Sequence, residues 1–235
     1  MKINLIIKSL LPPFLWNLAK KLKNKKKYFG LNNLDSKLEK YLNYNNGFFI
    51  ELGANDGIEQ SNTFFFEKNK NWKGILIEPI LHKYLECKKN RSKNNIYYFN
   101  ACVSFEFKDE FVKLLYSNLM TIPTNLESDI KDKFNHANFS NTMRNEKEDV
   151  VEFYAKAKTL NSILLDSKAP KVIDFLSIDV EGSELEILKG IDFDNFKFKY
   201  ILIECRDIDI ISNFLSKKHY TLLKQITHHD YLFKM

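Results

Sequence analysis

Short apolar runs alternate with amphipathic segments along most of the chain. The apolar runs are residues 47–52, 74–78, 95–103, 172–178 and 199–205. Apolar residues recur at helical spacing over about 60–70, 80–90, 159–166, 183–190 and 208–217. Uninterrupted apolar strands that alternate with helices are typical of a parallel sheet with helices on both faces. The pattern therefore predicts an α/β fold.

The end of the chain departs from this alternation. Residues 220–225 and 231–233 form two further apolar segments, which the polar sequence Thr227-His228-His229-Asp230 separates. Two such segments joined by a short polar turn predict an antiparallel hairpin. The expected architecture is a mostly parallel seven-stranded sheet that ends in a C-terminal antiparallel hairpin.

Residues 1–44 are expected to form a basic, amphipathic helical arm ahead of a domain that spans residues 45–235. Residues 1–27 contain eight lysines and no acid, whereas the whole chain has 36 Lys and Arg against 30 Asp and Glu. The net charge of +6 therefore belongs to the arm. One interpretation is that the arm packs on its own domain or on a second subunit of a homodimer. The other is a helix lying on an anionic membrane surface.

Residues 105–150 have a different composition from the rest of the domain. Asn and charged residues dominate here, and no hydrophobic period persists. A structureless connection of this length is usually either disordered or functional. We expect a lid that substrate orders in part, with simple disorder as the alternative.

Composition excludes several classes of protein. The domain lacks the basic stripe with interleaved aromatic residues that nucleic-acid binding requires. Cys87, Cys102 and Cys205 form no C-x-x-C pair, which argues against a zinc site and a disulfide framework. No run of apolar residues is long enough for a transmembrane helix, and the N-terminus does not have the pattern of a signal peptide. The sequence indicates a cytoplasmic protein, with residues 1–27 as its one candidate for peripheral contact with the inner membrane face.

The stretch from Phe48 to Gly57, FFIELGANDG, is the clearest candidate for a ligand-binding loop. Its apolar run ends in Glu51 and breaks into a loop with two glycines, and Glu78 ends the next apolar run. A strand, a glycine loop, a helix and a second strand ending in an acid form the layout of a nucleotide-binding unit. The loop matches neither phosphate-binding glycine pattern, and Glu51 would repel phosphate. S-adenosylmethionine suits this loop because it combines an adenosine with an ammonium and a sulfonium and has no phosphate.

Seven short sequence motifs follow one another along most of the chain between Phe48 and Glu204. They are ELGANDG (51–57), SNTFFFEK (61–68), WKGILIEP (72–79), NR (90–91), NACVS (100–104), TLNSILLD (159–166) and FLSIDVEGSELEILKG (175–190). In this order they resemble the FkbM-type family of class I S-adenosylmethionine-dependent methyltransferases. The resemblance implies a Rossmann-like class I fold, S-adenosylmethionine as cofactor and a variable substrate-facing segment at 105–150.

The loop and the resemblance together assign the cofactor site. The loop after Glu51 would hold the amino-acid half of the cofactor, Glu78 would accept the ribose hydroxyls, and residues 100–104 would contact adenine. The expected cofactor-binding residues are Glu51, Gly53, Ala54, Asn55, Asp56, Gly57, Asn62, Thr63, Glu78, Pro79, Ala101, Cys102 and Asp179.

Acids at the ends of the fourth and fifth predicted strands are candidates for catalysis. Asp179, Glu181 and Glu204 would lie at the edge of the sheet where α/β proteins bind ligands. His136, in the expected lid, is a further candidate base. A divalent metal is not favoured, because Arg206 follows Glu204 closely. Glu184 and Glu186 are expected on a solvated helix face. Arg91 is expected at the surface, with contact to an acidic or phosphorylated substrate as the alternative.

The function expected from these residues is O-methyl transfer from S-adenosylmethionine to a hydroxyl of a sugar, either nucleotide-linked or part of a surface glycan precursor. The polar composition of 105–150 favours a sugar. Alternatives are methylation of an apolar secondary metabolite, which would require an apolar lid, and a non-catalytic cofactor-binding module. A nicotinamide oxidoreductase is excluded by the missing G-x-G-x-x-G pattern.

Overall fold

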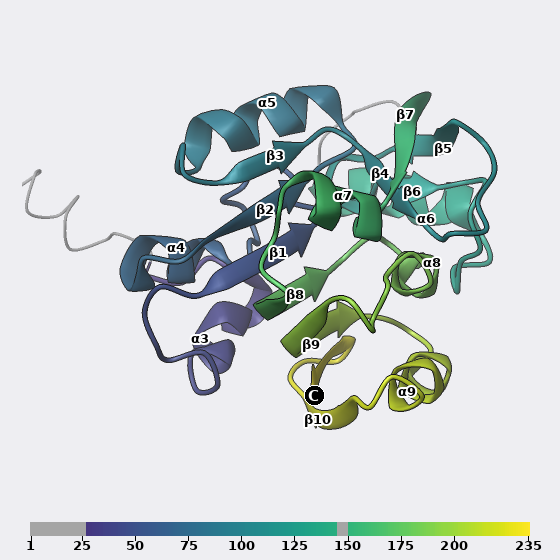
Figure 1. The fold of residues 1–235 in the computed structure, drawn as a ribbon. Helices are drawn as coiled ribbons and strands as arrows, with labels where there is room; N and C mark the ends of the chain where they lie inside the picture. The colour runs from purple at the N-terminus through teal and green to yellow at the C-terminus, as the bar shows by residue number, and fades with distance from the viewer. Residues whose placement is uncertain (1–26, 145–149) are drawn as a thin grey trace, which may run out of the picture.

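A seven-stranded sheet forms the centre of the computed structural model, which describes residues 27–144 and 150–235 (Figure 1). The expectations for residues 1–26 lie outside the described residues. Across the sheet the strands are β10 (Thr221–Gln225), β11 (Asp230–Lys234), β9 (Lys197–Glu204), β8 (Val172–Ile178), β1 (Phe48–Leu52), β2 (Lys73–Ile77) and β3 (Ile96–Tyr98). Strands β9 to β3 run parallel, and β11 pairs antiparallel with both β9 and β10. The predicted α/β class is confirmed.

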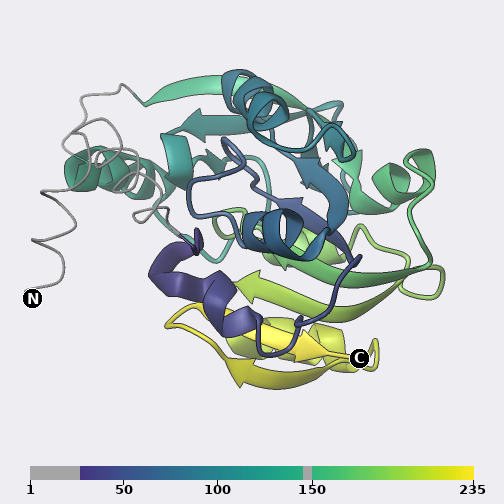
Figure 2. The same cartoon turned by 90° about the vertical axis from the view of Figure 1, so that its left-hand side faces the viewer.

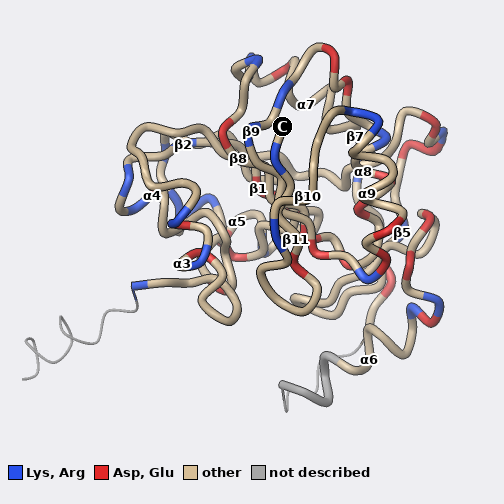
Figure 3. The backbone as a smooth tube through the Cα atoms, turned by 90° about the horizontal axis from the view of Figure 1, so that it is seen from below, with Lys and Arg blue, Asp and Glu red and all other residues tan. Residues whose placement is uncertain are grey.

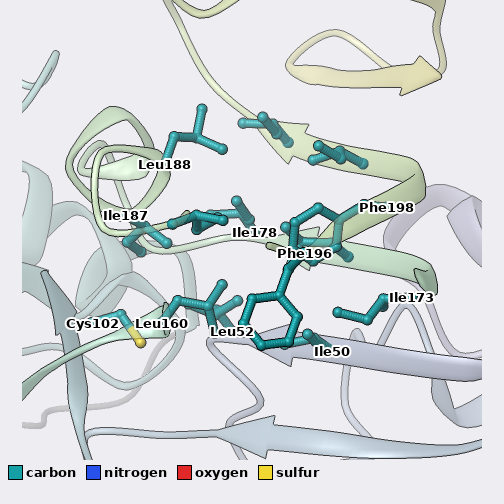
Figure 4. Packing of buried hydrophobic residues seen from close by; sticks show 14 of the residues in the cluster. Ile50, Leu52, Cys102, Leu160, Ile173, Ile178, Ile187, Leu188, Phe196 and Phe198 are labelled. Atoms are coloured by element: carbon teal, nitrogen blue, oxygen red, sulfur yellow. The ribbon is translucent and has the colours of Figure 1, made fainter. Parts of the chain in front are cut away.

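Helices pack on both faces of this sheet. On one face lie α7 (Leu160–Asp166), α8 (Glu184–Leu188) and α9 (Ile208–Ser216), and on the other α3 (Leu34–Leu38), α4 (Phe64–Lys70) and α5 (Leu81–Asn90). Alternate residues of β1 serve the two layers: Ile50 packs in the first and Phe49 in the second. Figure 4 shows part of the first layer, in which Ile50 and Leu52 of β1 belong to the same cluster as Leu160 and Phe196.

Residues 29–42 pack on the same core as β1. Leu34, Leu38 and Leu42 are almost completely buried with Phe66 and Leu232. Lys37 Nζ donates to the carbonyl oxygen of Ile226, 3.4 Å away, so that α3 lies beside the C-terminal hairpin, as Figure 2 shows. The described end of the predicted arm thus belongs to the hydrophobic core.

The expected strand at 95–103 is in fact two strands in two sheets. After β3 the chain turns at Phe99 and Asn100, and β4 (Ala101–Val103) pairs with β7 (Val151–Thr159) instead of β2. The Asn100 side chain fixes this turn, because its Nδ2 donates to the carbonyl oxygen of Lys156 at 3.0 Å. A second sheet with the order β4-β7-β5-β6 results.

Much of the segment expected to be a lid has regular structure. It contains β5 (Phe111–Tyr116), the 3-10 helix η2 (Asn118–Met120), β6 (Ile122–Pro123) and α6 (Lys133–Arg144). Val112 and Leu114 of β5 are buried with Ala155 of β7, so the second sheet has a small core of its own. Whether this inserted segment, residues 105–144, opens and closes as a lid stays a prediction. No helix of the part that the structure describes is long and apolar enough to cross a membrane.

Candidate functional site

A cavity of about 400 Å³ lies at the carboxyl ends of the parallel strands. The loops after β1, β2, β8 and β9 line it on one side, and β4, β5 and η2 line it on the other. Ligands of open α/β sheets bind at this edge. Predicted site residues on its wall are Glu51, Gly53, Ala54, Asn55, Asn62, Glu78, Pro79, Ala101, Cys102, Asp179, Glu181 and Glu204.

The loop after β1 takes a conformation that its glycine makes possible. Gly53 has a φ of +75°, and a Cβ there would lie 2.0 Å from the carbonyl oxygen of Asp179. This close approach joins the loop to the end of β8. The main-chain N–H groups of Gly53 and Ala54 both donate to the carbonyl oxygen of Ile77, at 3.1 and 3.2 Å. The loop is therefore held rigidly between β2 and β8.

Glu78, at the end of β2, faces the cavity from a buried position. Its Oε2 accepts from the main-chain N–H of Asn55 at 2.7 Å, and its Oε1 from that of Ile80 at 2.9 Å. Burial raises the pKa of Glu78 to about 7. Each carboxylate oxygen can accept a second hydrogen bond, so a ligand with two adjacent hydroxyl groups would find an acceptor here.

Glu51 lies in a buried network centred on Arg91. Its oxygens accept from Ser61, Asn62 and Thr63, and its Oε2 lies 3.2 Å from Arg91 Nη1. Arg91 Nε also pairs with Glu67 at 2.8 Å. The expectation of a surface arginine was wrong: its side chain is fully buried and reaches two carboxylates. Although Glu51 is on the cavity wall, the partners of its carboxylate are those of a group that fixes the loop.

Three predicted cofactor residues are absent from the cavity wall. Asp56 Oδ1 accepts from the N–H groups of Ile58 and Glu59, both at 2.8 Å, and so closes a turn. At Gly57 a Cβ would lie 2.7 Å from Arg91 Cγ. Thr63 is fully buried in the arginine network. These residues therefore fix the conformation of the loop from the side that faces away from the cavity.

Two buried polar atoms on the cavity wall have no hydrogen-bond partner in the protein. They are Oδ1 of Asn62 and Oγ of Ser183, whose residues are 6% and 2% exposed. Asn62 is oriented by its Nδ2, which donates to Ser177 Oγ at 3.1 Å. Buried polar atoms normally have a partner, and an unpaired acceptor costs free energy. Asn62 Oδ1 thus fits a ligand that donates hydrogen bonds, such as the ammonium group expected from the sequence. Ser183 had not been expected in the site.

Two carboxyl groups meet at the ends of β8 and β9. The side chains of Asp179 and Glu204 lie close enough for each to affect the pKa of the other, and a proton between them would satisfy both carboxyl groups. Burial, together with the negative charges of Glu204 and Glu181, raises the pKa of Asp179 well above its ordinary value. Burial also raises the pKa of Glu204. Two carboxylates held together in this way cannot both ionise easily, so the pair binds a proton more tightly than an exposed acid does.

Glu181 connects this pair to the inserted segment. Its Oε2 lies 2.7 Å from His136 Nε2 on α6 and 3.8 Å from Arg206 Nη2. The backbone of Glu181 has a φ of +56°, which is uncommon for a residue with a side chain and shows that this turn is held by its surroundings. His136 does not line the cavity, and it reaches the site only through Glu181.

The two acids expected on a solvated face of α8 are instead buried. Glu184 is 3% exposed and Glu186 7% exposed. Glu184 Oε1 accepts from the N–H of Gly182 at 2.9 Å, and Glu186 pairs with Lys189 at 2.8 Å. Helical spacing alone could not reveal this, because α8 has only five residues and packs against β4. Among residues 27–144 and 150–235, no group of three or more His, Cys, Asp or Glu is arranged to hold a metal ion.

Apolar side chains of the inserted segment form much of the remaining wall. Leu119 and Met120 of η2, Leu114 of β5 and Phe139 of α6 line the cavity, and Leu31 joins them from the chain before β1. Phe139 and Leu31 are more than half exposed. The polar composition of 105–150 had suggested a polar lid, but its side chains on the cavity wall are largely apolar.

The fold and the cavity define an α/β protein whose ligand site lies at the carboxyl edge of a mainly parallel sheet. The family model described as "Methyltransferase FkbM domain" matches residues 51–233. The chain therefore belongs to the FkbM methyltransferase family, as the sequence motifs indicated.

Two other comparisons complete this result. A search of curated proteins gave no match. Among solved structures, the crystal structure of methyltransferase FkbM from Methylobacillus flagellatus KT is similar to this chain, with a TM-score of 0.43 and 15% sequence identity. The match covers 81% of this chain and 44% of that chain, so this chain spans less than half of the length of that protein.

Proposed function

We propose that this protein transfers a methyl group from S-adenosylmethionine to a hydroxyl group. The observation that supports this most is that one cavity is lined both by residues 51–55 of the ELGANDG loop and by the carboxyl pair of Asp179 and Glu204. Family membership supports methyl transfer, and the class I Rossmann-like architecture inferred from the sequence supports this cofactor.

The cavity offers a suitable group for each part of the cofactor. Asn62 Oδ1 would accept from the ammonium, Glu78 would accept from the ribose hydroxyls, and Ala101 and Cys102 would lie against adenine. When bound, S-adenosylmethionine supplies a methyl group already activated on a sulfonium. The protein then needs only to align the acceptor and remove its proton.

The Asp179 and Glu204 pair is the proposed base. With one shared proton it keeps one negative charge, and it can take a second proton from the acceptor hydroxyl. Burial raises the proton affinity of both carboxyl groups and so makes them stronger bases than exposed acids. Glu181 would lie next to this pair, and its own position would be fixed by the contact with His136.

The acceptor proposed first is a sugar hydroxyl, either on a nucleotide-linked sugar or on a surface glycan precursor. The proposed setting is the cytoplasm, with residues 1–27 in contact with the inner membrane face or with a second subunit. Neither nucleic acid nor a required metal is part of this proposal.

A second class of acceptor is favoured by one observation, the apolar wall formed by the inserted segment. Such a wall suits an acceptor with an apolar surface, as in a secondary metabolite or a glycoside with an apolar aglycone. The acidic residues on the cavity wall also favour this class, because they would repel the phosphates of a nucleotide-linked sugar. Among the described residues, Arg206 is the only Lys or Arg on this wall, and six acids line it: Glu51, Glu59, Glu78, Asp179, Glu181 and Glu204.

Substitution of Asp179 tests the proposed reaction. Asp179→Asn should lower turnover about a hundredfold or more, because the pair loses one of its two proton-accepting groups. The assay follows labelled methyl transfer to nucleotide sugars, free sugars and alkyl glycosides, and Glu204→Gln is the matched variant. Unchanged turnover in both variants would remove the pair from the mechanism, and a rate that survives a chelator would exclude a required metal.

Substitution of Phe139 tests the acceptor class. Phe139→Asp places a charge on the apolar wall and should raise KM for an alkyl glycoside about tenfold, while the affinity for S-adenosylhomocysteine stays unchanged. Phe134→Asp is the control, because Phe134 is on the same helix, is 60% exposed and does not line the cavity. Equal effects of the two substitutions would contradict an apolar acceptor site.

A further inference from the structure

The inserted segment is attached to the catalytic edge of the sheet at Asp129. The main-chain N–H of Asp129 donates to the carbonyl oxygen of Gly182 at 3.1 Å. Its Oδ2 accepts from the main-chain N–H of Arg206 at 3.0 Å, and its Oδ1 lies 3.8 Å from Arg206 Nη1. One residue thus holds both the loop after β8 and the end of β9.

Gly182 shows how closely the inserted segment packs against the loop after β8. Its φ is +93°, and a Cβ there would lie 2.6 Å from Ser128 Oγ and 2.7 Å from Asp129 Oδ1. A side chain at this position would strain the backbone and displace the side chains of Ser128 and Asp129 from their present contacts. Next to Gly182 lies Glu181, whose carboxylate contacts both His136 and Arg206.

We propose that Asp129 is a positioning residue, which fixes Arg206 beside Glu204 and keeps the Glu181–Gly182 turn in place. This inference rests on the proposed function, because it assigns a role to the carboxyl pair of Asp179 and Glu204. Asp129 itself is not on the cavity wall, so it acts through Arg206.

The guanidinium of Arg206 gives this contact a measurable consequence. Its positive charge lowers the pKa of Glu204 and so opposes the larger effect of burial. If Arg206 moves away, the carboxyl pair should bind its proton more tightly. The titratable and charged groups around the pair and Arg206, from every element packed there, are Glu181, Glu184, Cys205, Asp207, His229, Asp230, His136 and Asp129.

Three variants separate positioning from a simple loss of charge. In Asp129→Ala, Arg206 loses its anchor, and the titration midpoint of the carboxyl pair should rise by about one pH unit. In Asp129→Asn, the amide oxygen can still accept from the Arg206 N–H, so the midpoint should move by less than half as much. Loss of the negative charge alone would lower the midpoint, and would do so equally in both variants. Glu127→Ala is the control, because Glu127 is an acid two residues earlier whose side chain is 78% exposed and pairs with Lys189 at 3.0 Å, away from Arg206.

Two readouts are used on the full chain. Carbon-13 NMR of labelled Asp and Glu carboxyl groups gives the midpoint without cofactor. Calorimetry gives the ratio of the affinities for S-adenosylmethionine and S-adenosylhomocysteine against pH, which should follow the charge of the pair because only the former is a sulfonium. An unchanged midpoint with a lowered melting temperature in Asp129→Ala would overturn the positioning role. If the wild type binds neither compound, the proposed function is wrong, while the NMR midpoints still decide the role of Asp129.

Discussion

The Glu184 carboxyl group shows how strongly burial governs single residues near the site. It is 3% exposed, and its Oε1 accepts from the main-chain N–H groups of Gly182 at 2.9 Å and Val180 at 3.4 Å. Burial outweighs these hydrogen bonds and raises the pKa of Glu184 to about 8. The folded protein therefore binds a proton more tightly than the unfolded chain at this position.

This difference predicts how stability depends on pH. Below the pKa that Glu184 has in the unfolded chain, its carboxyl group is neutral in both states, and its ionisation does not affect stability. As pH rises from about 4.5 to about 8, the unfolded chain ionises and the folded protein loses relative stability. Glu184→Gln keeps an acceptor oxygen and cannot ionise, so it should match the wild type near pH 4.5 and exceed it by up to roughly 5 kcal/mol above pH 8, because each pKa unit corresponds to about 1.4 kcal/mol.

Chemical unfolding at several pH values measures this difference, with Glu127→Gln as a control at an exposed acid. A constant difference between Glu184→Gln and wild type across this pH range would contradict the assignment.

At the residue level, the sequence identified those site residues whose position follows from a strand end. Glu78, Asp179 and Glu204 each come directly after an apolar run, so their place at the sheet edge could be predicted. Ser183 and Arg91 could not be predicted, because their roles depend on contacts between segments that are distant in sequence. Arg91, for example, lies 40 positions from Glu51.

Arg91 also links three elements of the structure. From the end of α5 it reaches Glu51 on β1, Glu67 on α4 and the carbonyl oxygen of Gly57, which lies 2.9 Å from its Nη1. A buried charge with two carboxylate partners is costly to remove, because those partners remain buried without it.

Arg91→Met should therefore lower the free energy of unfolding by about 3–5 kcal/mol. Lys89→Met, on the same last turn of α5 but exposed, should change it by less than about 0.5 kcal/mol. Thermal and urea unfolding of both variants measure the two values. Similar small losses would mean that the network around Arg91 adds little to stability.

The central strands β1, β2, β8 and β9 of the main sheet were predicted well because each carries a run of buried apolar residues. The second sheet was missed, since its strands give a weaker signal. In β5, buried Val112 and Leu114 alternate with partly exposed residues, and in β7 only Ala155 is fully buried. The residues Val151, Phe153, Ala155 and Ala157 of β7 do alternate with Glu152, Tyr154, Lys156 and Lys158, so the sequence contained a strand period that the prediction overlooked.

At the scale of the whole molecule, acidic residues and the cavity lie at the same edge of the main sheet, the carboxyl ends of its parallel strands. Acidic positions in Figure 3 include a group around α8 and α9, which follow the strands that carry the proposed base. The sequence could show that these acids follow strands, but not that the inserted segment would close one side of the cavity with apolar side chains. That arrangement depends on the pairing of β4 with β7 across more than fifty residues.

The central claim is that this cavity binds S-adenosylmethionine through the ELGANDG loop and Glu78. Calorimetric titration of S-adenosylhomocysteine into the wild type and into Glu78→Ala tests it most directly, with circular dichroism to show that the variant is folded. The account predicts one bound molecule per chain and a loss of about 1–3 kcal/mol in the variant, because the ribose hydroxyls lose their acceptor. No binding to the wild type, or wild-type affinity in Glu78→Ala, would contradict it.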